Sequence, residues 1–394
     1  MKRIRQIGWL GATRGLLLLC VPVLAAGPWL FDLSQQSLLT EFFTMLVLAL
    51  MWNLLAGYAD IITVGQHAFV GVGAYAFFGL AVLANVNAFI AIPLAALITL
   101  VIAIPTMAVI FRLRTAYLAV GTWVAAEVMM LVAGKLPGFG GGPGASLRIS
   151  VVKEFGASLT GRTTTFYLMS FALALIAFGA TWALLRSRVG LGLTAMRDNE
   201  EAAGSAGVNL TRTRILCFLW TAPFLGLAGV LVTLSKLRVA PSASFSITDW
   251  TIYVIFIVVI GGIGSLEGPV IGTILFFLLR EYLSGFGTWY LIILGVISIA
   301  FILFEPRGVW GACRRWRLPD LVPVTHVPEG TVLRPVTPPF RNLIRLGRWS
   351  QGNFSAFSPL AFSFLHQRVG QVAKEGRKLA ESEVGRREMW LGRG

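Results

Sequence analysis

Two ionisable side chains stand inside long apolar stretches of this sequence. His67 lies in a Gly-rich apolar run, and Glu127 is the one charged residue between positions 115 and 134. An ionisable group inside an apolar helix is costly, so it should face other protein groups and pair with them. Proton transfer or substrate contact is the chemistry open to both. A hydrogen bond to a neighbouring helix explains Glu127 at least as well, and a paired packing role is favoured for His67.

A second group of polar residues lies in a loop between two apolar segments. Asp198, Glu200 and Glu201 stand at the start of a short Ala-rich stretch, where acids suit the positive end of a helix dipole. Gly207 follows and is typical of a helix terminator. The pattern predicts a short amphiphilic helix over 196–207 that lies on a membrane face. Composition alone favours an ordinary capped loop helix.

Several common catalytic motifs are absent from the sequence. It contains no G-x-x-x-x-G-K-[ST], so the chain has no P-loop with which to cradle ATP. H-E-x-x-H, G-x-S-x-G and Cys/His clusters are also missing, so neither hydrolytic nor metal chemistry is indicated. The Gly-rich stretch 138–144 follows no predicted strand, which argues against phosphate binding there. We therefore expect no enzyme activity, no metal site and no cofactor.

Composition identifies the environment that must position these residues. Of 394 residues, 56% are hydrophobic and 13% are charged, with a mean hydropathy of +0.77. Soluble domains carry roughly 25% charged residues, so a soluble enzyme, a disordered chain and a secreted disulfide scaffold are excluded. The net charge is +15, but more than half of the excess lies beyond Glu305. This location indicates an integral membrane protein in a lipid bilayer, with no nucleic-acid partner.

The apolar segments predict the architecture. Helices are expected because a backbone in hydrocarbon must satisfy its own hydrogen bonds. We therefore predict an all-α, polytopic membrane helix bundle of about ten transmembrane helices with one short cytoplasmic helix. The third segment and the eighth and ninth are rich in Gly and are expected to be broken or tightly packed. The predicted spans are 15–31, 37–56, 61–84, 88–111, 115–134, 166–185, 214–235, 250–263, 268–284 and 288–304.

Basic residues indicate the orientation. Between Arg14 and Arg112 there is no Lys or Arg, whereas the N-terminal residues are basic. The positive-inside rule then places the N-terminus in the cytoplasm, and ten crossings return the C-terminus there. The loop 135–165 is basic although it would be external, but longer loops influence topology less. Cleavage of the segment 15–31 as a signal peptide is the less favoured alternative.

The chain divides by composition into two regions. Residues 1–311 are predicted to form the membrane domain, with the polar loop 186–213 exposed on its cytoplasmic side. Residues 312–394 are Pro-rich and then basic, and are interpreted as a poorly ordered cytoplasmic tail. Attraction of its Arg side chains to anionic lipid is a secondary reading.

The polar loop carries a resemblance to a known family. Glu201-Ala202-Ala203, three residues and then Gly207 resemble the EAA loop of ABC importer permeases. The wider string M-R-D-N-E-x-A-A-x-x-x-G-V-N is similar to one branch, the permeases of branched-chain amino acid importers of the larger-subunit type. Amide and urea permeases are close relatives that share it. The I-x-L-P ending of the general signature is absent.

Three further motifs occur in the order that this branch shows. They are N-L-L-A-G-Y-A-D-I-I-T-V-G-Q-H-A-F-V-G-V-G-A-Y (53–75), Y-L-A-V-G-T-W-V-A-A-E (117–127) with F-G-G-G-P-G-A-S-L (139–147), and G-G-I-G-S-L-E-G-P-V-I-G-T (261–273) with F-E-P-R-G-V-W-G (304–311). Gly140 replaces the usual Thr of the second motif. The resemblance covers about residues 37–311.

The resemblance implies partners and a mechanism. Such a subunit forms half of a path for branched-chain or related amino acids, with a second related permease, P-loop ATPase subunits that bind the ATP, and an extracytoplasmic solute-binding protein. It implies the bacterial inner membrane as location. An amide or urea permease, or a self-sufficient secondary carrier or channel that uses Glu127 and His67, is an alternative.

Two sets of site residues follow from the resemblance together with the physical reading. Gly65, Gly71 and Gly73 give one helix segment a smooth face, and close helix packing explains them as well as lining of a path does. The surface that couples to the ATPase is predicted to comprise Arg197, Asp198, Glu201, Ala202, Ala203 and Gly207. The translocation path is predicted to include Thr63, Gly65, His67, Gly71, Gly73, Thr122, Glu127, Gly261, Gly262 and Gly264.

Overall fold

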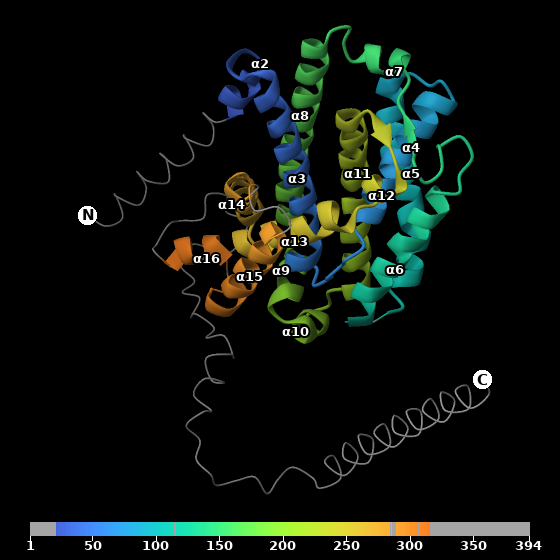
Figure 1. Ribbon diagram of the computed structural model, residues 1–394. Helices are drawn as coiled ribbons and strands as arrows, with labels where there is room; N and C mark the ends of the chain where they lie inside the picture. Colours follow the sequence, from blue (N-terminus) through green and yellow to red (C-terminus); the bar gives the residue numbers. More distant parts are fainter. Residues whose placement is uncertain (1–20, 114–115, 284, 286–288, 306–307, 316–394) are drawn as a thin grey trace, which may run out of the picture. The chain divides into compact units, whose positions relative to one another are not determined.

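Helices make up most of the described part of the chain. The computed structural model describes residues 21–113, 116–283, 285, 289–305 and 308–315 (Figure 1). All of them belong to the first of two units, Met1–His326, and the second, Val327–Gly394, lies outside the described residues. The basic N-terminus and the predicted tail beyond Arg315 therefore also lie outside them.

The elements follow one another with short connections. In chain order they are α2 (Gly27–Leu30), α3 (Leu33–Tyr58), α4 (His67–Phe78), η1 (Gly79–Leu83), α5 (Ala88–Ile110), α6 (Ala116–Ala133), β1 (Ala145–Ser146), α7 (Ile149–Glu154), α8 (Leu159–Arg186), α9 (Arg188–Asp198), α10 (Glu200–Ser205), α11 (Leu210–Lys236), β2 (Arg238–Val239), α12 (Pro241–Ser244), η2 (Thr248–Ile252), α13 (Tyr253–Gly261), α14 (Gly268–Leu283), α15 (Trp289–Phe304) and α16 (Gly308–Arg315). Here η marks a π-helix. The two short strands pair antiparallel, with Ala145 opposite Val239.

These helices confirm the prediction of an all-α, multi-pass membrane protein. Within the described residues, five stretches are long and apolar enough to cross a membrane. They are Leu33–Tyr58, Ala88–Ile110, Leu159–Arg186, Leu210–Lys236 and Pro241–Gly261. Shorter apolar helices cover His67–Leu83, Tyr117–Ala133 and Ile292–Phe301. Each predicted span from 37–56 onward overlaps a helix, whereas 15–31 lies only partly inside the described residues. The number of crossings stays a prediction.

Helix α3 is the centre of the bundle. It begins with a capping box, in which Asp32 caps the first turn and the Gln35 side chain accepts from the Asp32 N–H. From Phe43 to Leu55 its side chains are buried on every side, as expected for a helix segment in the middle of a bundle. It packs against α8, α11, α13 and α14, so α3 connects helices from both halves of the chain.

Helices α4 and α11 pack with their backbones in close approach. A Cβ at Gly73 would overlap the carbonyl group of Gly226, and a Cβ at Gly229 would overlap that of Val70. This arrangement is the close packing that small residues allow between membrane helices. It confirms that Gly73 belongs to a smooth helix face.

The third predicted span is shorter than expected. The prediction of a helix from residue 61 is wrong, because α4 begins only at His67 and the preceding chain is non-helical. Asp60 adopts a left-handed conformation (φ 54°), which ends α3. The carbonyl of Thr63 accepts a hydrogen bond from Trp52 Nε1 (2.9 Å), and the Val64 N–H donates to Thr122 Oγ1 (3.1 Å). Side chains of α3 and α6 thus take the place of helical hydrogen bonds.

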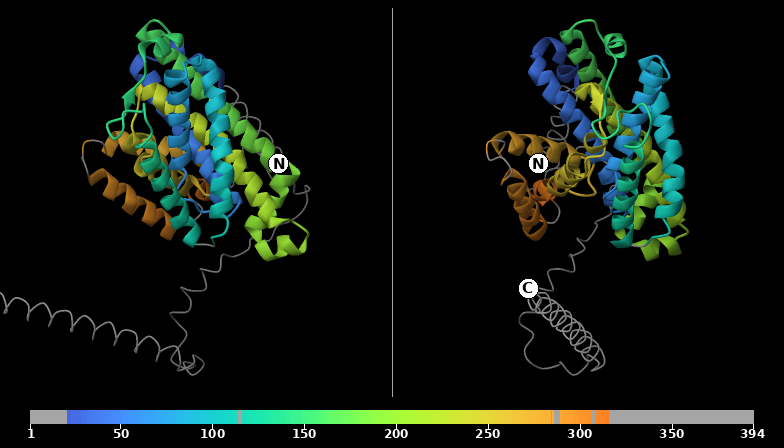
Figure 2. Two further views of the ribbon diagram at one scale, coloured as in Figure 1. Left: turned by 90° about the vertical axis from the view of Figure 1, so that its right-hand side faces the viewer. Right: turned by 45° about the vertical axis from the view of Figure 1, so that its right-hand side comes forward.

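Helices α9 and α10 lie at one end of the bundle in all three views (Figures 1 and 2). α10 contacts α9 and the first part of α11. The break between α13 and α14 lies close to the same end, because Gly264 approaches Gly57 near the end of α3. This end, called the α10 end below, brings the polar loop and the second Gly-rich segment together.

Candidate functional site

The polar loop folds as two short helices. The prediction of a single helix over 196–207 is wrong, because the chain is extended at Asn199 (φ −162°, ψ 111°) between α9 and α10. The Asn199 side chain accepts a hydrogen bond from the Ala202 N–H (2.9 Å) and so caps α10. Asp198 therefore ends α9, while Glu200 and Glu201 occupy the first turn of α10.

Gly207 terminates this segment as predicted. It has a φ of +89°, and the N–H of Val208 bonds back to the carbonyl of Ala203 (3.0 Å). Glu201 and Ala202 are exposed, but Ala203 is 3% exposed. Ala203 therefore packs inward, beneath the exposed Glu201 and Ala202. The role of these residues in coupling to the ATPase stays a prediction.

The exposed side of α10 borders an acidic hollow. Its volume is about 750 Å³, and it lies between the end of α3, the α9–α10 connection and the start of α11. Four carboxylates line it together with one cation: Asp60, Asp198, Glu200, Glu201 and Arg197. An excess of one charge sign in a concave surface attracts a partner of the opposite sign. The hollow can therefore receive a basic protein segment.

Arg214 ties α10 to the rest of the bundle. Its Nη1 and Nη2 donate to the two carboxylate oxygens of Glu200 (3.0 and 2.9 Å), and its Nε donates to the carbonyl of Ala59 (3.3 Å). Such a bidentate pair fixes geometry as well as distance. The position of α10 is thus set by residues at the end of α3 and the start of α11.

We expect Arg214→Ala to lower the thermal stability of the purified complex more than Glu200→Ala does. Loss of the partly exposed ion pair costs about 1 kcal/mol or less. Arg214→Ala also removes the donor to Ala59 and a second, longer ion pair with Asp60 (4.0 Å), which together add about 1 kcal/mol. Melting temperatures of the two variants, followed by size-exclusion chromatography in detergent, measure the difference. Equal losses would argue against a role for the contacts of Arg214 with Ala59 and Asp60.

A hydrogen-bonded connection leads from α9 to the break between α13 and α14. Arg197 Nη1 donates to the carbonyl of Gly264 (3.0 Å), and the guanidinium lies over the ring of Tyr58, 5.5 Å from its centroid. From α3, Asn53 accepts from the Gly264 N–H and donates to the Ser265 carbonyl, both at 2.8 Å. The turn after α13 is therefore held from two sides.

The glycines of this turn have the conformation that the sequence predicts. Gly261 ends α13, and Gly262 and Gly264 have φ values of +127° and +75°. Residues with a Cβ rarely adopt such values. A helix break is confirmed here, and its Gly264 contacts the predicted coupling residue Arg197.

Sequence reasoning missed several residues that build this site. Asn53, Gly57 and Arg214 were in none of the predicted sets, although each contacts the loop or the turn. Asn53 could have been identified from the sequence, because a polar side chain inside an apolar helix needs a hydrogen-bond partner. Gly57 and Arg214 gave no such indication, since small and basic residues are common at helix ends.

The predicted path residues of α4, of the non-helical stretch before it and of α6 are engaged in packing. A Cβ at Gly65 would overlap the carbonyl of Thr122, and one at Gly71 would overlap the Phe245 ring. Thr63 is buried, and its Oγ1 has no hydrogen-bond partner among the described residues. The cavity beside these residues has a volume of about 10 Å³, too small for a solute. A role in translocation stays a prediction.

The two ionisable residues have different surroundings. His67 is 1% exposed, and its Nδ1 lies 3.0 Å from Thr251 Oγ1, while its Nε2 has no partner among the described residues. Glu127 is half-buried and accepts a hydrogen bond from Trp123 Nε1 (3.1 Å). Since Trp123 lies one turn earlier on α6 itself, this bond is local to the helix. Whether Glu127 contacts substrate stays open.

Comparisons with known proteins agree on one family. The family described as "Branched-chain amino acid transport system / permease component" matches residues 35–302. The permease protein LivM of the high-affinity branched-chain amino acid transport system of Salmonella typhimurium is 26% identical over 318 residues, covering 75% of this chain and 74% of the relative. The Escherichia coli LivM protein shows the same identity and coverage.

A second type of permease also matches. The probable branched-chain amino acid permease LivH of Methanocaldococcus jannaschii is 28% identical over 164 residues, 39% of this chain and 50% of the relative. No solved structure matches the chain significantly. The matched residues contain all the motifs named above except the last one, 304–311, and they include α9 and α10. The prediction of a permease subunit is confirmed, and the chain belongs to the family of branched-chain amino acid transport system permease components.

Proposed function

We propose that this chain forms half of the transmembrane path of an ABC importer for branched-chain or related amino acids. Its partners are a second related permease, P-loop ATPase subunits that bind the ATP, and an extracytoplasmic solute-binding protein. The acidic hollow beside α10 supports the proposal most directly. It is an exposed, charged surface, and Arg197 in its lining donates a hydrogen bond to Gly264 in the break between α13 and α14. The chain itself serves transport and catalyses no reaction.

The coupling step begins at α10. Closure of the ATPase dimer on ATP binding moves the segment that is docked in the hollow, and α9 and α10 move with it. Glu201 pairs with a basic side chain of the partner, and the small Ala202 and Gly207 permit close approach. Arg197 passes the displacement to Gly264 and so to α13 and α14. Alternating access results when the two permease halves rock from inward to outward opening.

Orientation follows from this assignment. An ATPase requires the α10 end to face the cytoplasm, in agreement with the basic residues Arg186, Arg188, Arg197 and Arg212 of the loop. With the ten predicted crossings, both termini are also cytoplasmic, and the opposite end of the bundle faces the solute-binding protein. The proposed location is the inner membrane of a bacterium.

Purification from the native membrane tests this assignment. The tagged chain, extracted in mild detergent, should bring down ATPases and a second permease, identified by mass spectrometry. Proteoliposomes with the complete set of subunits should take up L-leucine only with ATP inside and binding protein outside. Uptake of urea or short amides in place of leucine would favour an amide permease. Transport by the chain alone without ATP would favour a secondary carrier.

Arg197→Ala is expected to uncouple ATP hydrolysis from transport. The variant loses the bond to Gly264 and the contact with Tyr58, so motion of α9 no longer reaches the helix break. Coupling free energies of this kind correspond to roughly 5- to 150-fold, and we expect about a tenfold lower ratio of leucine transported to ATP hydrolysed. Parallel uptake and phosphate-release measurements give this ratio. An unchanged ratio would remove Arg197 from the coupling route.

A further inference from the structure

A second large pocket lies away from the α10 end. Its volume is about 690 Å³, within the range of small-molecule sites. Residues of α3, α11, η2, α13 and α14 line it, among them Lys236, the last residue of α11. Since α11 begins beside the acidic hollow at Leu210 and is 27 residues long, the pocket and the hollow lie towards opposite ends of the bundle. On the proposed orientation, the pocket is in the outer half of the membrane domain.

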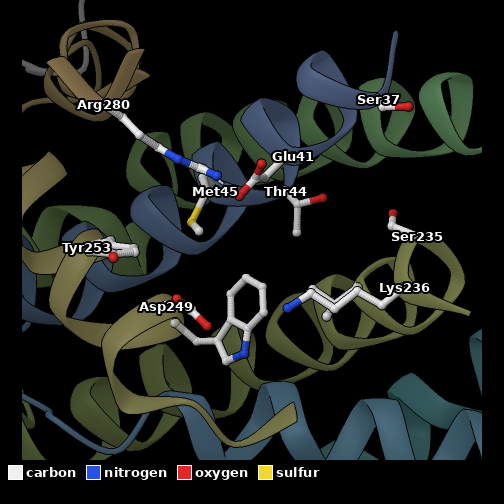
Figure 3. A pocket seen from close by; sticks show the side chains of 11 residues that line it. Ser37, Glu41, Thr44, Met45, Ser235, Lys236, Asp249, Tyr253 and Arg280 are labelled. Atoms are coloured by element: carbon white, nitrogen blue, oxygen red, sulfur yellow. Dashed lines mark hydrogen bonds and ion pairs between the residues drawn. The ribbon is translucent and has the colours of Figure 1, made fainter. Parts of the chain in front are cut away.

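Four charged side chains converge on this pocket. Arg280 Nη1 forms an ion pair with Glu41 Oε1 at 2.7 Å, and the two side chains are 40% and 41% exposed. Figure 3 shows Arg280 reaching towards Glu41 on one side of the pocket, with Lys236 and Asp249 on the other. The Lys236 ammonium lies 5.1 Å from the centre of the Trp250 ring. Among the described residues, neither Lys236 nor Asp249 forms an ion pair.

The charges of the pocket balance. The carboxylates of Glu41 and Asp249 balance the cations of Lys236 and Arg280, so the lining has no net charge. It nevertheless presents both negative and positive groups to a ligand. Apolar groups complete the lining, including Met45, Val232 and the ring of Trp250. A ligand that matches this set carries one positive and one negative charge and an apolar group. Burying an uncharged solute would remove water from Lys236 and Asp249 and give neither of them an oppositely charged partner.

We propose that this pocket is a binding site of the permease for zwitterionic aliphatic amino acids. The α-carboxylate of the ligand bonds to Lys236 and Arg280, and the α-ammonium group to Asp249 and Glu41. The aliphatic side chain packs against Met45 and Trp250. The inference rests on the proposed function and extends it, because it assigns recognition of the amino-acid head group to this chain as well as to the solute-binding protein.

Direct binding tests the site apart from transport. The detergent-purified complex with its partner subunits, but without the solute-binding protein, is titrated with radiolabelled L-leucine. Competition by 3-methylbutylamine, which lacks the carboxylate, and by 4-methylpentanoate, which lacks the ammonium group, should be at least about tenfold weaker than by unlabelled leucine. Competition by either analogue as strong as by leucine would overturn recognition of both charges.

Two variants test the residues. The single variant Lys236→Gln should weaken leucine binding about tenfold or more. The double variant that combines Glu41→Gln and Arg280→Gln should do the same. Lys135→Gln is the matched control, since Lys135 is exposed at the end of α6 and does not line the pocket. It should bind leucine within twofold of the wild type. Lys236 is itself exposed, so its replacement leaves the fold intact even if the double variant fails to assemble.

The outcomes separate this inference from the proposed function. Normal ATP-dependent uptake together with unaltered leucine binding by Lys236→Gln would reject the pocket and leave the importer assignment standing. Normal uptake with no leucine binding by the wild-type complex would do the same. Absence of any ATP-dependent leucine uptake with all subunits present would reject the proposed function itself.

Discussion

Glu201→Arg is expected to abolish ATP-dependent leucine uptake while the complex still assembles in the membrane. Glu201 is exposed in the first turn of α10 and lines the acidic hollow. On the proposed docking, its reversal places a cation against the basic segment of the ATPase. Like charges brought together in an interface cost several kcal/mol, and each 1.4 kcal/mol is a factor of ten. We expect a loss of at least about a hundredfold, measured as uptake into proteoliposomes.

The control for this variant lies at the same end of the bundle. Arg212→Glu also reverses an exposed charge, near the start of α11, but Arg212 does not line the hollow. It should retain at least half of the wild-type uptake.

Gly207→Asp should lose uptake as Glu201→Arg does, because an Asp at φ +89° strains the turn that ends α10. Normal uptake by Glu201→Arg would remove α10 from the coupling surface.

The helices could be predicted from the sequence because the bilayer leaves few alternatives. Long apolar runs must satisfy their backbone groups internally, and the runs near 88–111 and 288–304 became α5 and α15 almost residue for residue. The start of α4 could not be found this way. It depends on side chains of Trp52 and Thr122, which replace helical bonds from distant positions in the chain.

Local chemistry explains the error at the polar loop. Acidic residues before an Ala-rich stretch suggest one helix start, and Asp198 and Glu200 fit it equally well. Asn199 decides between them, since its side chain caps the Ala202 N–H and its own backbone is extended. An Asn immediately before two Glu residues was the indication that could have revealed the second helix.

The composition of the site depends on contacts between distant segments. Arg197 and Gly264 are 67 positions apart and Asn53 and Ser265 are 212 apart, so spacing along the chain gives no clue to either pair. The motifs themselves were visible because each has an unusual local composition. The fold brings the polar loop and the Gly-rich turn between α13 and α14 together at the α10 end. Because Arg197 bonds to Gly264 there, a displacement of the loop is passed to the turn.

Gly73→Leu is expected to have the largest effect on stability. Gly73 of α4 faces the backbone of Gly226 on α11, and even a Cβ there would overlap the Gly226 carbonyl. Backbone atoms cannot rotate away as side chains can, so α4 and α11 would have to separate. Overpacking a tight core costs typically 1–3 kcal/mol and occasionally more, and we expect about 3 kcal/mol or more here. The complex should yield little monodisperse protein after mild-detergent extraction.

Gly179→Ala separates this effect from the general properties of glycine. Gly179 lies on α8, and no atom lies within 4 Å of the position that a Cβ would occupy there, so Ala fits without displacement. Replacing a helical Gly by Ala gains about 0.5–1 kcal/mol from the reduced freedom of the unfolded chain. The yield and melting temperature of Gly179→Ala should equal or exceed those of the wild type. If Gly73→Leu behaved like Gly179→Ala, α4 and α11 would have to be further apart than the close approach of Gly73 and Gly226 allows, and the small-residue face of α4 would then be free to line a path.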